Sequence, residues 1–424
     1  MWVGYELLVL LGSLIYLPRA IWRKRLPHRG WGMRLGHYPA EVLQQLQGRD
    51  SLWVHAVSVG EVLAVQPLVR ELAATYPQHP IVLSTVTATG FAVAQQRLGD
   101  VAVPVFFPLD LRWCVRRAFQ SLRPRLLVLV ESELWPMVIR SAHARGIAVV
   151  VVNGRMSPRA FRRYRWVKPW MAALLRDVTL LLMQSDDDAT RLRALGASPQ
   201  QVQVVGNLKW EASLRSRPSP QEIQATAERI GLTRHDQVMV AGSTHRGEEV
   251  LLLRAVAQLR QVSPSLRCII APRHVERVAE VERLIRQHGY AVVRLSQAAA
   301  ASKWDVGLVD TLGQLPQYYG VADVVIVGGS FIPHGGQNPL EAASLGKPII
   351  FGPFMHNFAQ IAQQLLSHEA ARQVTDLEHL REALRECLTD RASAQAMGRR
   401  AQALAERAHG TCQRTLLAIQ NVLS

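Results

Sequence analysis

The chain has 424 residues, enough for two domains that each bury a core of their own. Its formal net charge of +16 favours an anionic partner, which could be a nucleic acid, an anionic membrane surface or a phosphorylated substrate. Its 4 cysteines are too few and too scattered for a disulfide framework or a CxxC metal site, which suits a reducing compartment.

The N-terminal stretch has the pattern of a membrane anchor. Residues 2–17 are almost wholly apolar apart from Glu6, and a basic cluster follows them. A secretory signal would carry positive charge before the apolar run and a small-residue cleavage site after it, and neither is present. We therefore predict an uncleaved anchor over residues 1–26, spanning the membrane or lying in its interface, with the rest of the chain on the cytoplasmic side. The alternative is a buried first helix of a soluble domain.

From Leu52 onward, strand and helix patterns alternate, which predicts a doubly wound α/β domain over residues 27–212. The predicted strands of this domain are 52–57, 81–84, 126–130, 147–152 and 202–205, and its predicted helices are 62–76, 91–98 and 189–195. The polar stretch 213–221 is predicted to be the linker to a second domain.

The second domain, residues 213–424, repeats the alternation. Its predicted strands are 237–241, 268–271, 290–294, 306–309, 324–327 and 349–351, and its predicted helices are 248–262, 275–288 and a long helical region, 377–423. The last helix could pack back on the first domain. Two such domains would leave a cleft between their carboxyl edges, where two substrates could meet.

The most informative stretch follows the strand at 324–327. That strand stops at Gly328, a glycine-rich loop follows, and residues 338–341 (Asn-Pro-Leu-Glu) start a helix with an N-cap Asn, a Pro at the first helical position and a Glu at the third. A loop of this kind, at the carboxyl edge of a parallel sheet, is where nucleotides and phosphates bind. We place a donor site here. The alternative is that Glu341 only caps the helix and the glycines only form turns.

Two other segments of the second half, 242–245 and 271–274, also follow strands and should lie beside the Gly328 loop, with Arg273 well placed to face a phosphate. The segment 310–315 should present a helix N-terminus. The chain has no GxxxxGK[ST] loop, no GxGxxG after a strand and no HExxH, which argues against a P-loop ATPase, a dinucleotide oxidoreductase and a zinc protease.

In the first half, the segment His55-Ala-Val-Ser-Val-Gly-Glu61 runs from a strand through a loop to a carboxylate at a helix start. The helix dipole is expected to lower the pKa of Glu61 and keep it ionised at neutral pH, as a general base acting on a sugar hydroxyl requires. The alternative is an ordinary first-turn glutamate that complements the dipole.

Three more segments have two or more interpretations. The hydroxyl-rich loop 84–90 could hold an anionic or polyhydroxyl ligand, or could cap the following helix. Glu131 and Glu133 could act at the sheet edge or pair with nearby arginines. Residues 159–170 interleave basic and aromatic side chains, which suits a phosphorylated amphiphile, a single-stranded nucleic acid or a plain solvated helix.

Taken together, these segments resemble one family. The motifs HAVSVGE, ESELWP, NGRMS, GNLKW, GSTHRGEE, APRH, DTLGQL and GGSFIPHGGQNPLEAA occur in this order over nearly the whole chain and resemble the 3-deoxy-D-manno-oct-2-ulosonic acid (Kdo) transferases of lipopolysaccharide synthesis. The resemblance implies a two-domain GT-B glycosyltransferase fold. It also implies transfer of Kdo, with inversion, from CMP-Kdo to the lipid A precursor at the cytoplasmic face of the inner membrane, with no metal or other cofactor and no nucleic-acid partner.

The resemblance also assigns residues. It implies that Glu61 is the general base. It implies a CMP-binding set of Pro272, Arg273, Leu312, Gly313, Gln314, Asn338, Pro339, Leu340 and Glu341. Further candidates for donor or phosphate contacts are Arg155, Asn207, Lys209, Ser243 and Thr244.

Two residues depart from the family pattern, because Gln314 and Arg246 stand where the family has acidic residues. We expect activity to persist and only donor affinity to change. Two alternatives remain open: another GT-B transferase that uses a UDP-sugar, and a non-catalytic, basic, membrane-tethered binding protein.

Overall fold

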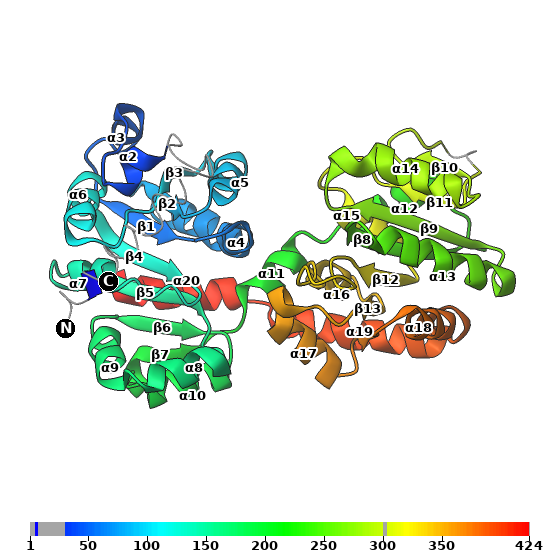
Figure 1. Cartoon of the computed structure of the whole chain (residues 1–424). Coiled ribbons are helices and arrows are strands. Elements are labelled where there is room, and N and C mark those ends of the chain that lie inside the picture. The colour runs from blue at the N-terminus through cyan, green and yellow to red at the C-terminus, as the bar shows by residue number, and fades with distance from the viewer. Residues whose placement is uncertain (1–4, 7–29, 300–302, 424) are drawn as a thin grey trace. The chain divides into compact units, whose positions relative to one another are not determined.

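The structure is a computed structural model that describes residues 5–6, 30–299 and 303–423. The chain divides into two compact units, Met1–Ala212 with Gly410–Ser424 and Ser213–His409 (Figure 1). The predicted anchor, residues 1–26, lies outside the described residues except for Tyr5 and Glu6. None of the helices in the described ranges combines the length and the apolar character needed to cross a bilayer.

The first unit is built on a seven-stranded parallel sheet in the order β3-β2-β1-β4-β5-β6-β7. Its strands are β1 Ser51–His55, β2 Ile81–Thr85, β3 Ala102–Phe106, β4 Pro124–Val130, β5 Ala148–Gly154, β6 Leu180–Met183 and β7 Val202–Val204. The strand order reverses between β1 and β4, so the carboxyl ends of these two strands flank the topological switch point where ligands bind in doubly wound folds.

Helices cover both faces of this sheet, which is why its strands are continuous apolar runs. Along β1, Trp53 belongs to one apolar cluster and Leu52 and Val54 to the other, as the alternation of side chains in a strand requires. The helices are α2 Trp31–Arg34, α3 Ala40–Leu46, α4 Val59–Thr75, α5 Ala88–Leu98, α6 Arg112–Leu122, α7 Pro136–His143, α8 Pro158–Arg165, α9 Lys168–Arg176, α10 Asp186–Ala194 and, at the boundary, α11 Leu208–Arg215, with a 3-10 turn at Pro199–Gln201.

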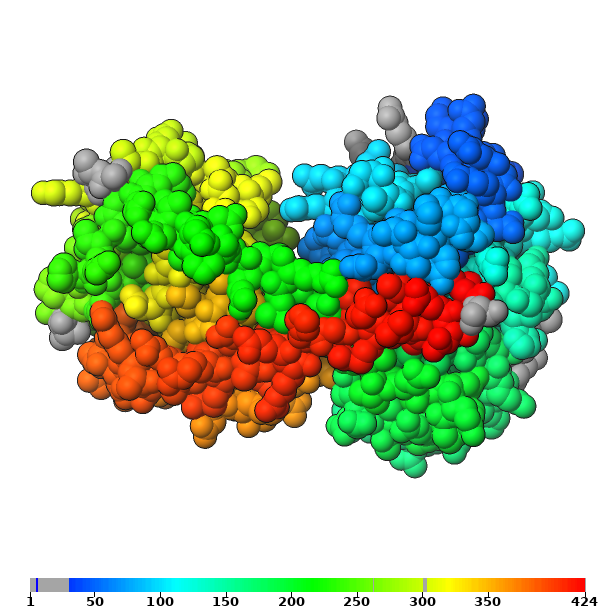
Figure 2. Space-filling view, turned by 180° about the vertical axis from the view of Figure 1, so that it is seen from behind, coloured from blue at the N-terminus to red at the C-terminus, as the bar shows by residue number. Residues whose placement is uncertain are grey.

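The C-terminal helix α20, Thr411–Leu423, belongs to the first unit. Leu416 and Ile419 join the apolar cluster that contains Val54 and Val65, and Figure 2 shows this helix in red along the first unit. The carboxylate of Glu211 accepts a hydrogen bond from the backbone N–H of Cys412 at 2.5 Å. The second unit is therefore inserted between two parts of the first.

The second unit contains another seven-stranded parallel sheet, in the order β10-β11-β9-β8-β12-β13-β14. Its strands are β8 Gln237–Thr244, β9 Leu266–Pro272, β10 Val292–Arg294, β11 Val306–Leu308, β12 Val324–Val327, β13 Ile349–Phe351 and β14 Arg372–Gln373. Its helices are α12 Pro220–Arg229, α13 Glu248–Val262, α14 Val278–Gln287, α15 Leu315–Val321, α16 Leu340–Ser344, α17 Ala359–Ser367, α18 Leu377–Thr389 and α19 Arg391–Arg407, with 3-10 turns at Val275–Arg277 and His356–Phe358. Both units are thus Rossmann-like α/β domains.

The predicted linker, residues 213–221, begins where the two units divide, but only its middle is non-helical. Helix α11 continues to Arg215 and α12 starts at Pro220, leaving only a short non-helical connection. The reason is local: the Ser219 hydroxyl accepts the N–H of Glu222, and the Glu222 carboxylate accepts the N–H of Ser219. This capping box turns a Ser/Pro-rich stretch into a helix start.

Candidate active site

The carboxyl group of Glu61 is held at the carboxyl edge of the first sheet. Glu61 stands in the first turn of α4, just after β1, and is 8% exposed. Its Oε2 accepts the backbone N–H of Val57 at 2.8 Å and its Oε1 accepts the hydroxyl of Ser58 at 3.1 Å. The side chain thus folds back over the β1–α4 turn with each oxygen held by one donor.

The prediction that Glu61 has a lowered pKa is wrong. Burial, followed by the negative charge of Glu131, raises its pKa to about 7, and the hydrogen bond from Val57 opposes this only in part. The helix dipole is outweighed because the carboxyl group is nearly shielded from water and has like charges beside it. A carboxylate with a pKa near the operating pH is a stronger base than an ordinary glutamate, so the correction strengthens Glu61 as a proton acceptor.

Glu131, at the end of β4, lies beside Glu61 and carries its own counter-ion. Lys209 places Nζ 2.5 Å from Oε1 of Glu131. The predicted alternative, pairing with arginines, is wrong for Glu131. Its backbone is in the left-handed region at φ 62°, a strained conformation that commonly marks functional sites. Glu133 lies nearby, and burial followed by the charge of Glu131 raises its pKa.

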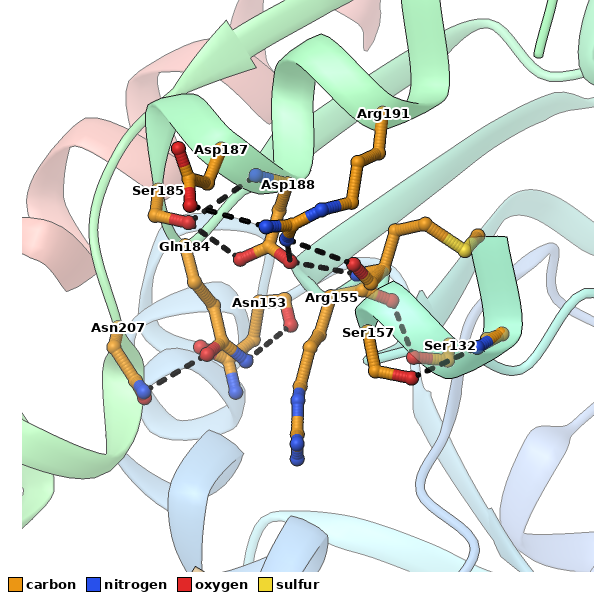
Figure 3. Close-up of polar contacts among 12 residues, drawn as sticks. Ser132, Asn153, Arg155, Ser157, Gln184, Ser185, Asp187, Asp188, Arg191 and Asn207 are labelled. Carbon is orange, nitrogen blue, oxygen red and sulfur yellow. Dashed lines mark hydrogen bonds and ion pairs between the residues drawn. The ribbon is translucent and has the colours of Figure 1, made fainter. Parts of the chain in front are cut away.

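The end of β5 and the turn after it add a second group of polar residues at this edge (Figure 3). Asn153 is completely buried at φ 54°, and its Oδ1 accepts the N–H of Leu208 at 3.0 Å. Asn207 donates from Nδ2 to Oε1 of Gln184 at 2.9 Å. The structure therefore brings Arg155, Asn207 and Lys209 to the same sheet edge as Glu61, although Asn207 contacts Gln184 and Lys209 contacts Glu131.

His55, the first residue of the HAVSVGE segment, is structural. Its ring is fully buried, stacks on Phe107 with ring centroids 3.6 Å apart, and lies 2.9 Å from the hydroxyl of Ser84 through Nδ1. Burial lowers its pKa to about 3, so the ring is neutral at physiological pH. In the hydroxyl-rich loop 84–90, Thr87 caps α5 by accepting the N–H of Gly90 at 3.0 Å.

In the second unit, one buried carboxylate organises the carboxyl edge. Glu248 is 1% exposed and accepts three backbone N–H groups, from Gly329 at 2.7 Å, His245 at 2.9 Å and Phe331 at 3.0 Å. It therefore ties the loop after β12 to the turn after β8. Glu248 was not among the predicted site residues; the signal for it in the sequence is the first glutamate of the helix start in GSTHRGEE.

The loop after β12 is packed too tightly for side chains. A Cβ on Gly328 would lie 2.3 Å from the carbonyl oxygen of Ser243, and the N–H of Gly328 donates to the carbonyl of Gly242 at 2.8 Å. Ser243 itself has φ 56°. The N–H of Arg273 donates to the carbonyl of Thr244 at 2.9 Å. The prediction that residues 242–245 lie beside the Gly328 loop is confirmed, and residues 271–274 lie beside residues 242–245.

The helix predicted to start at residues 338–341 begins one position later than expected: α16 has Pro339 and not Asn338 at the N-cap, has no side-chain capping bond at that position, and has Glu341 as its second residue. Asn338 accepts the N–H of Leu340 through Oδ1 at 3.1 Å and donates from Nδ2 to Oε1 of Glu341 at 3.3 Å. Burial raises the pKa of Glu341, while the bond from Asn338 and the positive charge of Arg273 oppose that shift. Arg273 is exposed, so its guanidinium is available at this edge. Thr244, in contrast, is buried and donates its hydroxyl to Glu249 at 3.0 Å.

Comparison with known proteins decides the family. Residues 29–212 match the family model described as 3-deoxy-D-manno-octulosonic-acid transferase (kdotransferase). The 3-deoxy-D-manno-octulosonic acid transferase of Bordetella pertussis is 33% identical over 382 residues, which cover 88% of this chain and 87% of that protein. The enzyme of the same name from Haemophilus influenzae is 30% identical over 87% of this chain and 86% of its own. The chain belongs to the Kdo transferase family, and it is a glycosyltransferase.

The fold of this Kdo transferase family member also occurs in nucleotide-sugar enzymes. The UDP-GlcNAc 2-epimerase of Neisseria meningitidis, solved with UDP-GlcNAc bound, aligns with a TM-score of 0.57 over 86% of this chain and 100% of its own. Its sequence is only 14% identical, so the likeness shows the fold alone.

The two departures from the Kdo transferase pattern have different surroundings. Gln314 accepts the hydroxyl of Thr311 through Oε1 at 2.7 Å, so its side chain closes the turn that leads into α15. Leu312 in that turn is 78% exposed, and Gly313 has φ 81°. Arg246 forms an exposed ion pair with Glu280, with Nη2 2.9 Å from Oε2. Neither departure touches the hydrogen bonds of Glu61 or of Asn338.

Proposed function

We propose that this protein is an inverting transferase of GT-B fold that moves Kdo from CMP-Kdo to the lipid A precursor. The observation that carries the proposal is the Glu61 carboxyl, buried in a Kdo transferase family member, oriented by Val57 and Ser58, and raised in pKa to about 7. A group with these properties can accept a proton from an alcohol at neutral pH.

The proposed step is a single displacement. The acceptor hydroxyl oxygen bonds to the anomeric carbon of Kdo while the bond from that carbon to the CMP phosphate breaks, and the hydroxyl proton passes to Glu61. The donors from Val57 and Ser58 leave a lone pair on the carboxylate for that proton. We propose that cationic side chains, and not a metal, neutralise the phosphate that leaves.

We assign the donor to the second unit. Arg273 would neutralise the leaving phosphate, and Glu341 would accept hydrogen bonds from the ribose hydroxyls, with Asn338 holding it in place. The remaining proposed CMP contacts are Pro272, Leu312, Gly313, Gln314, Pro339 and Leu340, with Ser243 beside them. Because Thr244 is buried against Glu249, only its backbone is proposed to contribute.

We further propose that the protein acts at the cytoplasmic face of the inner membrane, held there by an anchor in residues 1–26. Two described residues of that stretch contact the first unit, as the alternative of a first helix packed on a domain would also have it. The hydroxyl of Tyr5 donates to Asp110 at 2.8 Å, and the carboxylate of Glu6 accepts the N–H of Arg112 at 2.9 Å. The anionic lipid surface would be attracted by the exposed basic residues of α8.

The deciding experiment is mass spectrometry of the lipid A precursor after incubation with CMP-Kdo and purified protein. Wild type should add one or more Kdo masses, and Glu61→Ala should add none while still binding CMP. Glu41→Ala is the matched control, because Glu41 is an exposed first-turn glutamate of α3 in the same unit. No product from folded wild type would refute the proposal, and competition between CMP and UDP would then test a UDP-sugar donor.

A further inference from the structure

The turn from Asn153 to Ser157 holds Arg155 in a fixed main chain. The carbonyl of Arg155 accepts the hydroxyl of Ser132 at 2.5 Å. The next N–H, of Met156, donates to Oδ1 of Asp188 at 2.9 Å. Ser157 then caps α8 by accepting the N–H of Ala160 at 3.2 Å. The backbone on both sides of Arg155 is therefore locked by side chains from other elements.

The guanidinium of Arg155, in contrast, has no partner among the residues that the structure describes. Figure 3 shows the side chain extended away from Asp188, with no dashed line to its guanidinium. It is half-buried, and it carries five N–H donors. The carboxylates near it are already paired, because Asp188 binds Arg191 at 3.4 Å and Glu131 binds Lys209 at 2.5 Å.

A second unpaired donor lies two residues earlier. Asn153 is completely buried, and the N–H of Leu208 fixes the orientation of its amide, since only the oxygen can accept that bond. Its Nδ2 is therefore the free end, and it has no hydrogen-bond partner in the described part of the chain. A buried amide donor without a partner is unfavourable, which points to a ligand that supplies the acceptor. In Figure 3 this nitrogen and the Arg155 guanidinium both point away from Asp188.

We infer that the guanidinium of Arg155 and the amide Nδ2 of Asn153 form a subsite for a phosphate group of the acceptor. A guanidinium binds two oxygens of one phosphate as a fork, which leaves a third oxygen for the amide. The subsite lies in the first unit, at the same sheet edge as Glu61, whereas every proposed CMP contact lies in the second unit. Helix α8 follows directly and exposes Arg159, Arg162 and Arg163, which suits an acceptor with several negative charges. The inference rests on the proposed function.

The test is a binding cycle in detergent micelles, in which calorimetry measures each affinity. One ligand is the lipid A precursor, and the other is the same lipid after a phosphatase has removed its phosphate monoesters. The proteins are wild type, Arg155→Gln, Arg155→Lys and, as control, Arg176→Gln, which removes an exposed positive charge at the end of α9.

Phosphate removal should weaken wild-type binding by roughly tenfold to a hundredfold, the range for a hydrogen-bonded charge pair. Arg155→Gln should bind the phosphorylated lipid roughly tenfold to a hundredfold more weakly than wild type does. Removing the phosphates should then weaken its binding little further. Arg155→Lys should fall between, and Arg176→Gln should match wild type. If removal of the phosphates weakens binding equally in Arg155→Gln and in wild type, the inference is wrong.

A second readout distinguishes the two anions that Arg155 could bind, a phosphate of the acceptor and the carboxylate of the donor. If Arg155→Gln raises the KM for CMP-Kdo and leaves lipid binding unchanged, the guanidinium serves the donor carboxylate and the inference is wrong. Failure of the proposed function itself would look different, because wild type would then form no product, while the binding cycle would still decide the role of Arg155.

Discussion

Lys209, in the first turn of α11, and Glu131, in the turn after β4, form an ion pair of 2.5 Å. The pair matters because Glu131 is also one of the charges that raise the pKa of Glu61. The cation that neutralises Glu131 thus limits how far the pKa of the proposed base can rise.

Removing the charge of Glu131 should move the pH profile of transfer one way, and removing the charge of Lys209 should move it the other way. In Glu131→Gln the negative charge disappears, the pKa of Glu61 falls, and the acid limb of kcat/KM moves to lower pH. In Lys209→Gln the charge of Glu131 is no longer compensated, so that limb moves to higher pH. Relative to its own value at pH 8, kcat/KM at pH 6 should rise roughly twofold to tenfold in Glu131→Gln.

Rate profiles from pH 5 to 9 would measure these shifts, with Arg176→Gln as a control that should leave the limb in place. If both variants move the limb in the same direction, the pair has another role.

Glu61→Gln should change how the stability of the protein depends on pH. The folded carboxyl has a pKa of about 7, against 4.5 for an ordinary glutamate, so the folded state binds more protons than the unfolded state between these pH values. The free energy of unfolding therefore contains a part that falls as pH rises from 4.5 to 7, and glutamine lacks it.

The gain in stability of Glu61→Gln over wild type should grow between pH 5 and pH 8, by up to about 3 kcal/mol for this buried group. Urea unfolding at both pH values would measure it, with Glu41→Gln expected to show no such trend. A constant difference across this range would argue against the raised pKa.

Glu248→Gln should loosen the loop after β12. The carboxylate accepts three backbone N–H groups, and an amide can accept at only one of its two ends, so at least one donor loses its acceptor and faces another donor. We expect a loss of about 1–3 kcal/mol in unfolding free energy and weaker CMP binding. Calorimetry with CMP and thermal unfolding would show both. Glu276→Gln, an exposed glutamate in the 3-10 turn after β9, should change neither.

Gly328→Ala and Gly60→Ala form a matched pair. The added Cβ on Gly328 would lie 2.3 Å from the backbone oxygen of Ser243, so the end of β8 would have to shift. A Cβ on Gly60, in the first turn of α4, meets nothing within 4 Å. Thermal unfolding should show a loss of roughly 1–3 kcal/mol for Gly328→Ala, as for overpacked cores. For Gly60→Ala we expect no loss, or a gain of about 0.4–1 kcal/mol. Equal effects would show that the loop adapts.

Where the sequence predicted the fold well, a single local signal was sufficient. Strands β12 and β13 are short β-branched runs with glycine or proline at their ends, and helix α13 starts at a pair of acidic residues, so the predicted bounds agree with the observed ones. Strand β3 was missed because Pro104 lies inside it. Proline is tolerated there because β3 is the edge strand of its sheet, a fact of topology that no local pattern contains.

The site divides in the same way. The position of Glu61 at a helix start follows from residue order along the chain. The N-cap of α16 does not, because it falls on Pro339 and not on the predicted Asn338. The pKa of Glu61 does not, because it depends on Glu131 approaching from another strand and on burial under the rest of the unit. The ion pair of Glu131 with Lys209 and the three donors gathered by Glu248 are likewise contacts between distant segments, which only the folded chain brings together.

The return of α20 to the first unit has a consequence for biosynthesis. A ribosome releases residues 1–212 first, but the apolar surface that Leu416 and Ile419 cover stays open until the whole inserted unit, Ser213–His409, has been made. The inserted unit is continuous in sequence and can fold as soon as it emerges. The first unit is therefore synthesised first but completed last. Its apolar surface stays exposed until α20, the last helix of the chain, has been synthesised.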